Sequence, residues 1–140
     1  MAKYVHKNAY IAINGTALSD HANTLTISNE AEKIDFTGFT ANGYREYGQG
    51  LRDCSVDVTF FQDFAAGSVH AILQPIWDSG TTLDLEVRPV NATVSATNPK
   101  GTMLARMYSY AGFGGKVGDA SEVEVSFQNA GTLGFVWGTA

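Results

Sequence analysis

The chain has 140 residues, 44% of them hydrophobic and 16% charged, and a formal net charge of −5. This length suits one domain whose core needs no disulfide or metal to hold it together. Tight binding to DNA or RNA is not expected, because it requires clustered basic side chains and the 9 Lys and Arg residues here are scattered. The charged share is low beside the usual ~25%, which favours contacts with other subunits.

The single cysteine, Cys54, excludes an intrachain disulfide and a multi-cysteine metal site. Its place at the start of an expected strand predicts a small buried residue. No charged start is followed by an apolar core, so we expect no secretory signal. No apolar run approaches the ~18 residues of a spanning helix. We therefore expect a soluble chain that is made in the cytoplasm and has no membrane partner.

The N-terminal part is expected to consist of short strands and turns. Residues 1–8 are polar and predict a flexible arm. Asn14-Gly15 predicts a tight turn between two short segments. The segments with strand character are Ala9–Ile13, Thr16–Asp20 as an edge or loop, Thr24–Ser28, and the weaker Lys33–Phe36.

Residues 37–53 contain four glycines and three aromatic residues, and no periodicity survives across them. A long loop inside a compact domain is usually functional or disordered, and disordered linkers are poor in aromatic residues. The composition is that of a contact surface, and we predict an assembly loop. The alternative is a hairpin that folds back on its own domain. The predicted contact residues are Phe39, Tyr44, Arg45, Tyr47 and Arg52.

Residues 55–89 predict a strand, a helix and a second strand. Ser55–Asp63 alternates between apolar and polar side chains, as a half-buried strand does. The apolar spacing then becomes helical, with Ser68 as candidate N-cap and Gly80 as candidate stop. Pro75 is expected to kink or shorten the last turn. The helical stripe is Val69, Ile72, Leu73, Ile76 and Trp77, and Thr81–Pro89 returns to alternation with Leu83, Leu85 and Val87 inward.

The C-terminal part predicts three further strands after a turn-rich loop, Asn91–Gly101. They are Met103–Tyr110, Ser121–Phe127, and Thr132–Trp137 with Leu133, Phe135 and Trp137 inward. The pattern indicates one mainly β domain over residues 1–140. Its architecture is a β-sandwich or partly closed barrel of about eight short strands with one flanking α-helix.

No catalytic or metal centre is apparent in the sequence. The three histidines, His6, His21 and His70, lie far apart and none has a ligand spacing to a cysteine or carboxylate. Asp84 with Glu86, and Glu122 with Glu124, are paired carboxylates, but each pair lies on the outward side of an alternating strand, as on a solvated sheet face. We therefore expect no enzyme and no cofactor. Self-association into closed rings, stacks or filaments remains.

The order of these segments resembles the major tail (tail tube) protein of long-tailed bacteriophages. The resemblance spans roughly Ala9 to Gly134 and rests on element order and turn residues. The segments that carry it are Tyr10–Asn14, Ile34–Gly38, the long loop to Gly50-Leu51, Val56–Asp63, the helix ending Ala71–Gly80, Leu83–Pro89, and Val117–Phe127 with Gly131 after it.

The resemblance implies a β-sandwich with one flanking helix, whose subunits form rings, typically of six. The rings stack into a hollow tube in the virion tail, from capsid to tail tip, and the tube passes the genome. It also implies other tail proteins as partners: the tape measure, terminator and tail tip. The loop 37–53 would reach a neighbouring ring, and the terminal segments would also contact the next ring. An acidic wall would let DNA slide past without specific binding. The predicted lumen-facing acids are Asp84, Glu86, Glu122 and Glu124.

Two other functions remain open. One is a capsid decoration protein or another structural protein of the phage head or tail. The other is a carbohydrate-binding β-sandwich, which needs an exposed aromatic platform. Trp77 and Trp137 are both expected to face the core, which argues against such a platform.

Overall fold

The structure is a computed structural model and describes residues 3, 5, 7–40 and 42–139. The predicted arm, residues 1–8, lies partly outside the described residues, as does His6. The described residues form eight strands and one helix, which confirms the predicted mainly β class. The elements are β1 (Tyr10–Ile13), β2 (Thr16–Ala17), β3 (Ala22–Asp35), β4 (Tyr47–Phe61), α1 (Val69–Ser79), β5 (Leu83–Arg88), β6 (Lys100–Met107), β7 (Glu122–Asn129) and β8 (Val136–Gly138).

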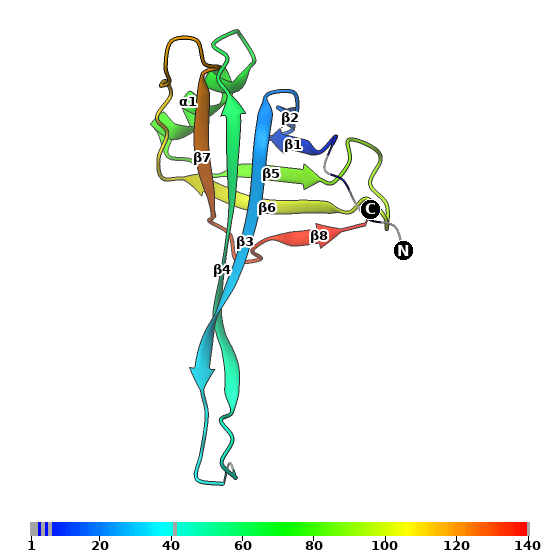
Figure 1. The fold of residues 1–140 in the computed structure, drawn as a ribbon, viewed down its shortest axis with the longest axis vertical. Helices are drawn as coiled ribbons and strands as arrows, with labels where there is room; N and C mark the ends of the chain where they lie inside the picture. Colours follow the sequence, from blue (N-terminus) through cyan, green and yellow to red (C-terminus); the bar gives the residue numbers. More distant parts are fainter. Residues whose placement is uncertain (1–2, 4, 6, 41, 140) are drawn as a thin grey trace.

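All eight strands belong to one antiparallel sheet, in the order β2-β1-β5-β6-β7-β4-β3, with β8 paired to β6 off this path. The sheet turns a corner between β6 and β7, which are joined only where Ala105–Met107 meets Phe127–Asn129. In Figure 1, β5 and β6 run across the direction of β3, β4 and β7. β8 pairs with Lys100–Thr102, at the start of β6. The sheet therefore wraps around a core without closing into a barrel.

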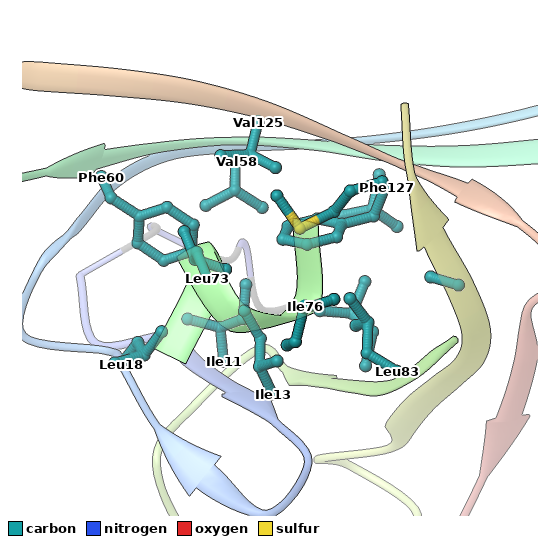
Figure 2. Packing of buried hydrophobic residues seen from close by; sticks show 14 of the residues in the cluster. Ile11, Ile13, Leu18, Val58, Phe60, Leu73, Ile76, Leu83, Val125 and Phe127 are labelled. Carbon is teal, nitrogen blue, oxygen red and sulfur yellow. The ribbon is translucent and has the colours of Figure 1, made fainter. Parts of the chain in front are cut away.

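The core fills the concave side of this bent sheet, and α1 covers it (Figure 2). Alternate residues of β4, β5, β6 and β7 point inward and are buried. Burying one such aliphatic or aromatic side chain stabilises the fold by about 1.5–3 kcal/mol. Cys54 is among the buried residues, as predicted, and desolvation raises the pKa of its thiol. The inward residues at the centre include Val56, Val58, Phe60, Leu83, Leu85, Val123, Val125 and Phe127.

The helix α1 begins after Ser68 and ends at Gly80, close to the predicted limits. The Ser68 hydroxyl makes no capping bond and instead donates to Asp63 Oδ2 at 2.8 Å. Gly80 has a φ of 67°, a left-handed conformation that glycine adopts without strain, and its N–H donates to the Ile76 carbonyl. Pro75 lies inside the helix, which continues past it to Ser79. No helix in the described residues is long and apolar enough to span a bilayer.

The predicted C-terminal strand is wrong in its limits and in two of its inward residues. β8 covers only Val136–Gly138, and Leu133 lies in the preceding turn with 85% of its surface exposed. Phe135 packs against the core, over Gly101, where a Cβ would overlap the Phe135 ring. Trp137 is half exposed and meets Phe135 edge-on at 5.1 Å. A strand with one short pairing partner cannot bury its alternate side chains.

Trp77 is also more exposed than predicted, because it lies at the edge of the helical stripe and 39% of its surface is accessible. The argument that both tryptophans face the core is therefore wrong. They still do not form a shared platform, since Trp77 is on α1 and Trp137 is on β8, and these elements lie apart in Figure 1.

Candidate assembly surfaces

The most prominent surface is a long hairpin that leaves the body of the molecule (Figure 1). β3 and β4 pair along their length, from Ala22 with Phe60 to Asp35 with Tyr47, whereas β7 covers β4 only from Ser55 to Phe61. Beyond that point the two strands have only each other. We call residues 29–53 the arm; this is a different segment from the flexible N-terminal arm predicted for residues 1–8. The side chains of its described residues, 29–40 and 42–53, are exposed or half-buried, whereas Cys54, immediately after it, is buried.

The structure corrects the predicted loop 37–53 in part. Tyr47 to Asp53 belong to β4, and the two predicted strands Thr24–Ser28 and Lys33–Phe36 are parts of the single strand β3. Residues 37–53 do belong to a hairpin, but it extends away from its own domain (Figure 1), so the alternative of a hairpin that folds back on that domain is wrong.

Two glycines on the arm give space to apolar side chains of the opposite strand. Phe36 lies over Gly48, where a Cβ would overlap its ring, and a Cβ at Gly50 would come within 2.6 Å of Ile34 Cδ1. A bulge between Ala31 and Lys33 interrupts the register here. Bulges and glycines increase the local twist of a strand pair. Ile34 and Phe36 therefore form an apolar strip along the arm, although no residue of the arm belongs to the core.

The tip of the arm, residues 36–46, is tied at its neck. The Phe36 N–H donates to the Glu46 carbonyl at 2.9 Å, and the Glu46 N–H donates to Thr37 Oγ1 at 2.9 Å. The Thr37 N–H donates to Asp35 Oδ1 at 2.9 Å. Hydrogen bonds from Thr37 lower the pKa of the Asp35 carboxyl. The tip is thus a defined turn that holds its side chains outward.

Three of the five predicted contact residues gather at this tip. Phe39 is fully exposed, Tyr44 is 80% exposed, and Arg45 reaches back to Asp35 at 3.3 Å while most of its side chain stays accessible. Tyr47 lies behind the tip, where Lys33 Nζ is 3.8 Å from the ring centroid. Arg52 is exposed farther back, at the bulge.

A second group of exposed aromatic side chains lies at the other end of the molecule. Phe64 comes from the loop between β4 and α1, and Phe113 from the loop between β6 and β7; their ring centroids are 6.2 Å apart. Phe64 also lies 4.8 Å from the His70 ring, and His70 Nδ1 is 2.9 Å from the Tyr110 hydroxyl. We call Phe64, His70, Tyr110 and Phe113 the distal cluster.

The four predicted lumen-facing acids lie in different halves of the bent sheet. Asp84 and Glu86 are on the outward side of β5, and Glu86 is paired with Arg88 at 3.2 Å and Lys100 at 3.7 Å. Glu122 and Glu124 are on the outward side of β7, and Glu124 stands opposite Thr59 of β4. The structure therefore keeps each pair together but separates the two pairs.

Further acids join Glu122 and Glu124 on the outward side of β3, β4 and β7. Asp57 stands between Thr26 and Ser126, and Glu30 is opposite Asp53. The outward positions from Thr24 to Glu30, from Asp53 to Phe61 and along β7 hold no Lys or Arg; all of them lie in described residues. We call this surface the acidic face. Its acids are Glu30, Asp53, Asp57, Glu122 and Glu124.

One group of polar side chains resembles a nucleophile arrangement in residue types but not in geometry. Asp63 accepts hydrogen bonds from the Ala65 N–H, from Ser68 Oγ at 2.8 Å and from His21 Nε2 at 3.0 Å. These bonds lower the pKa of the Asp63 carboxyl. The serine proton is thus directed at a weak base, and the histidine nitrogen that could take it is occupied by Asp63. The hydrogen bonds of this group join the residue before β3, the loop after β4 and the residue before α1.

No family model matches the sequence, and no curated protein matches it. Solved structures match its fold. A chain of the SPP1 tail tube is 17% identical, with a TM-score of 0.76 over 99% of this chain and 80% of that one. A chain from the virion of a native gene transfer agent particle is 19% identical, with a TM-score of 0.74 over 96% and 99%. A chain from the tail of an empty gene transfer agent particle, refined with C6 symmetry, is 20% identical, with a TM-score of 0.65 over 86% and 83%.

The chain shares the fold of a tail tube subunit. The resemblance drawn from the order of segments is therefore confirmed for the fold.

Sequence reasoning missed two surfaces of this tail tube fold. Phe64 and Phe113 stand alone in glycine-containing loops, and only the tertiary structure brings them together. Asp57 was visible as an outward residue of an alternating strand. Glu30 and Asp53, which lie on the same face as Asp57, could not be assigned to it from the sequence, because β3 was not recognised as one continuous strand.

Proposed function

We propose that this chain is a structural protein of the virion of a long-tailed phage or phage-like particle. Its copies join into rings, with six subunits as the expected number, and the rings stack into a hollow tail tube through which DNA passes. Its main partner is a second copy of itself. The other tail proteins implied by the resemblance, the tape measure, terminator and tail tip, contact the ends or the interior of this tube. The chain performs no catalysis.

The observation that carries this proposal is the arm. It exposes Phe39, Tyr44, Ile34 and Phe36 on a two-stranded extension that adds no residue to the buried core. Isolated two-stranded hairpins are marginal in water, and an exposed apolar surface of this kind marks an interaction site. The match in fold to chains of assembled tails supports the same conclusion.

The free edge of β3 adds a second argument. β3 is the last strand of the sheet and pairs only with β4 among the described residues. Long uncovered edges invite pairing with another chain, and natural proteins protect them where no such pairing is needed. A neighbouring subunit in the ring would cover this edge.

Electron microscopy of the purified protein in negative stain, at high concentration, tests the proposal. We expect hollow tubes or stacked rings. The double variant F39S/Y44S is expected to give single rings or free subunits. The matched control is Y108S, which removes an exposed aromatic ring on the body. Wild-type protein that stays monomeric or trimeric and binds empty capsids would instead indicate a decoration protein.

A further inference from the structure

We propose that the arm tip of one copy docks on the distal cluster of a copy in the next ring. This inference rests on the proposed tube and names the receptor for the arm. In short, Phe39 and Tyr44 of one subunit pack on Phe64 and Phe113 of another.

The positions of the two surfaces carry the first step. The arm tip and the loops that hold Phe64 and Phe113 lie at opposite ends of the long axis of the molecule (Figure 1). A stack of identical rings is a head-to-tail assembly, in which one surface of each subunit meets a different surface of the next. With the long axis of each subunit placed along the stack, the tip end of one copy meets the distal end of a copy in the next ring.

The tip offers aromatic rings that its own chain leaves uncovered. Phe39 is fully exposed and Tyr44 is 80% exposed. Both are presented by a turn that is closed at its neck by two hydrogen bonds, from the Phe36 N–H to the Glu46 carbonyl and from the Glu46 N–H to Thr37 Oγ1. A turn with these hydrogen bonds already formed loses less conformational entropy on docking than an unstructured segment would.

The distal cluster offers a supported aromatic platform. Phe64 and Phe113 are 57% and 77% exposed. Beneath them His70 is held by the Tyr110 hydroxyl, which also accepts a hydrogen bond from Gln62 Nε2 at 3.0 Å. This network holds His70 in place, Phe64 packs on His70, and Phe113 packs on Phe64. Exposed aromatic rings supported in this way can make edge-to-face or offset pairs with an incoming ring.

Charge supports the same pairing. The cation Arg45 stands at the tip, with most of its side chain accessible. At the distal end, Asp63, Asp119 and Glu122, the first residue of β7, outnumber one base, Lys116. The second loop forms a hollow that is lined by Gly114, Gly115, Lys116, Asp119, Ala120 and Glu122. Two carboxylates beside one ammonium group give this hollow a negative charge, which suits a guanidinium that arrives with the aromatic tip.

Photo-crosslinking in assembled tubes tests the contact directly. A benzophenone amino acid replaces Phe39 in one isotope-labelled population, which is mixed with unlabelled wild-type protein before assembly. We expect cross-linked peptides that join position 39 of a labelled copy to the Phe64 or Phe113 segment of an unlabelled copy. The control carries the same group in place of Tyr108 and is expected to label neither segment. Tubes in which position 39 cross-links elsewhere would overturn this inference and leave the tube proposal standing.

A double-mutant cycle provides a second measurement that needs no modified residue. F39A and F113A are each expected to raise the critical concentration of tube formation about 3- to 10-fold, the range expected for lost aromatic pairs. If the two rings meet, the double variant raises it no further than the worse single variant. Effects that multiply, as expected for F39A with the control Y108A, would refute the contact. Wild-type protein that forms neither rings nor tubes would overturn the tube proposal, and this inference with it.

Discussion

Asn98 shows how a single buried side chain organises a loop that has no regular structure. Its Oδ1 accepts a hydrogen bond from the Val90 N–H at 3.1 Å, and its Nδ2 donates to the carbonyls of Val90, Ala92 and Thr93. The side chain therefore supplies the bonds that a strand partner would otherwise make between β5 and β6. Buried backbone groups without such partners are costly.

We expect N98A to destabilise the protein by about 1–3 kcal/mol, because it leaves these backbone groups unsatisfied. Urea unfolding of the dilute, unassembled chain measures the effect. N91A is the control, since Asn91 lies in the same loop with an exposed side chain. Equal midpoints for N98A and N91A would show that water replaces the Asn98 amide without cost.

Asp63 is expected to make the folded chain less stable as the pH falls into the acid range. Hydrogen bonds from the Ala65 N–H, Ser68 and His21 lower the pKa of its carboxyl in the folded state. A group with a lowered folded-state pKa contributes stability above its unfolded pKa and loses it as the pH falls through the folded value. The unfolded value is close to the ordinary 3.8. The contribution is therefore complete at neutral pH and fades below pH ~4.

D63N should weaken this dependence on pH. We expect the variant to be less stable than wild type at neutral pH, and the difference to shrink on acidification from about pH 6 to about pH 3. Denaturant unfolding at a series of pH values gives the two curves. Parallel curves would mean that the Asp63 carboxylate contributes no pH-dependent stability.

At the scale of elements, the arm is a long strand pair that packs against no part of the hydrophobic core. Its residues make the β3–β4 ladder and the neck of the tip, but no contact with α1 or with the inward side of the sheet is needed to form them. Such segments open with low free energy in a free chain. Docking on a neighbour would remove that freedom.

Hydrogen exchange should reveal the change. In the free chain we expect fast amide exchange in residues 29–53 and slow exchange in β4 from Val56 to Phe60. In assembled tubes the arm should become protected to a level near that of the core, because neighbouring copies cover it. Mass spectrometry of pepsin fragments resolves the two regions. Equal protection of the arm in both states would contradict a role in assembly.

An element could be predicted from the sequence where one of its sides is buried in the core, because burial imposes a periodic apolar pattern. The segment from Val56 to Arg88 buries one side of each element, so its periods of two and near four predicted strand, helix and strand in the right order. The start of β4 at Tyr47 was missed, because its first residues lie in the exposed arm. The arm strands are exposed on both faces and carry Gly48 and Gly50, so no alternation marks them. β8 failed for a related reason, because its short pairing with β6 leaves Trp137 half exposed. The predicted contact residues at the tip came from composition, whereas their pairing in space required the structure.

At the scale of the whole molecule, charge is unequal on the two halves of the bent sheet. Glu86 is neutralised by Arg88 and Lys100, whereas the acidic face has no basic residue among its outward positions. Glu122 accepts a bond only from the neutral amide of Asn23 at 3.2 Å among the described contacts. A wall that passes DNA must repel phosphates along its whole length. We therefore propose that the acidic face, rather than the side of β5, lines the lumen.

Two pairs of charge reversals distinguish the halves. D57K/E124K places bases on the acidic face, and D78K/D84K makes the same change in net charge on α1 and β5 while keeping the Glu86 ion pairs. Both variants should build tubes of normal length, since these side chains lie outside the core. Particles whose tails contain D57K/E124K should deliver DNA at least about 10-fold less efficiently, because lysines in the lumen hold the phosphates. Particles with D78K/D84K should deliver it normally.

The two readouts separate assembly from passage. Electron microscopy reports tube length, and the infectious titre per particle reports delivery. A loss of titre confined to D78K/D84K would move the lumen to the β5 half of the sheet. Full titre for both variants would mean that neither half meets the DNA. Because the two variants carry equal charge, a difference between them can come only from where the charge stands relative to the channel.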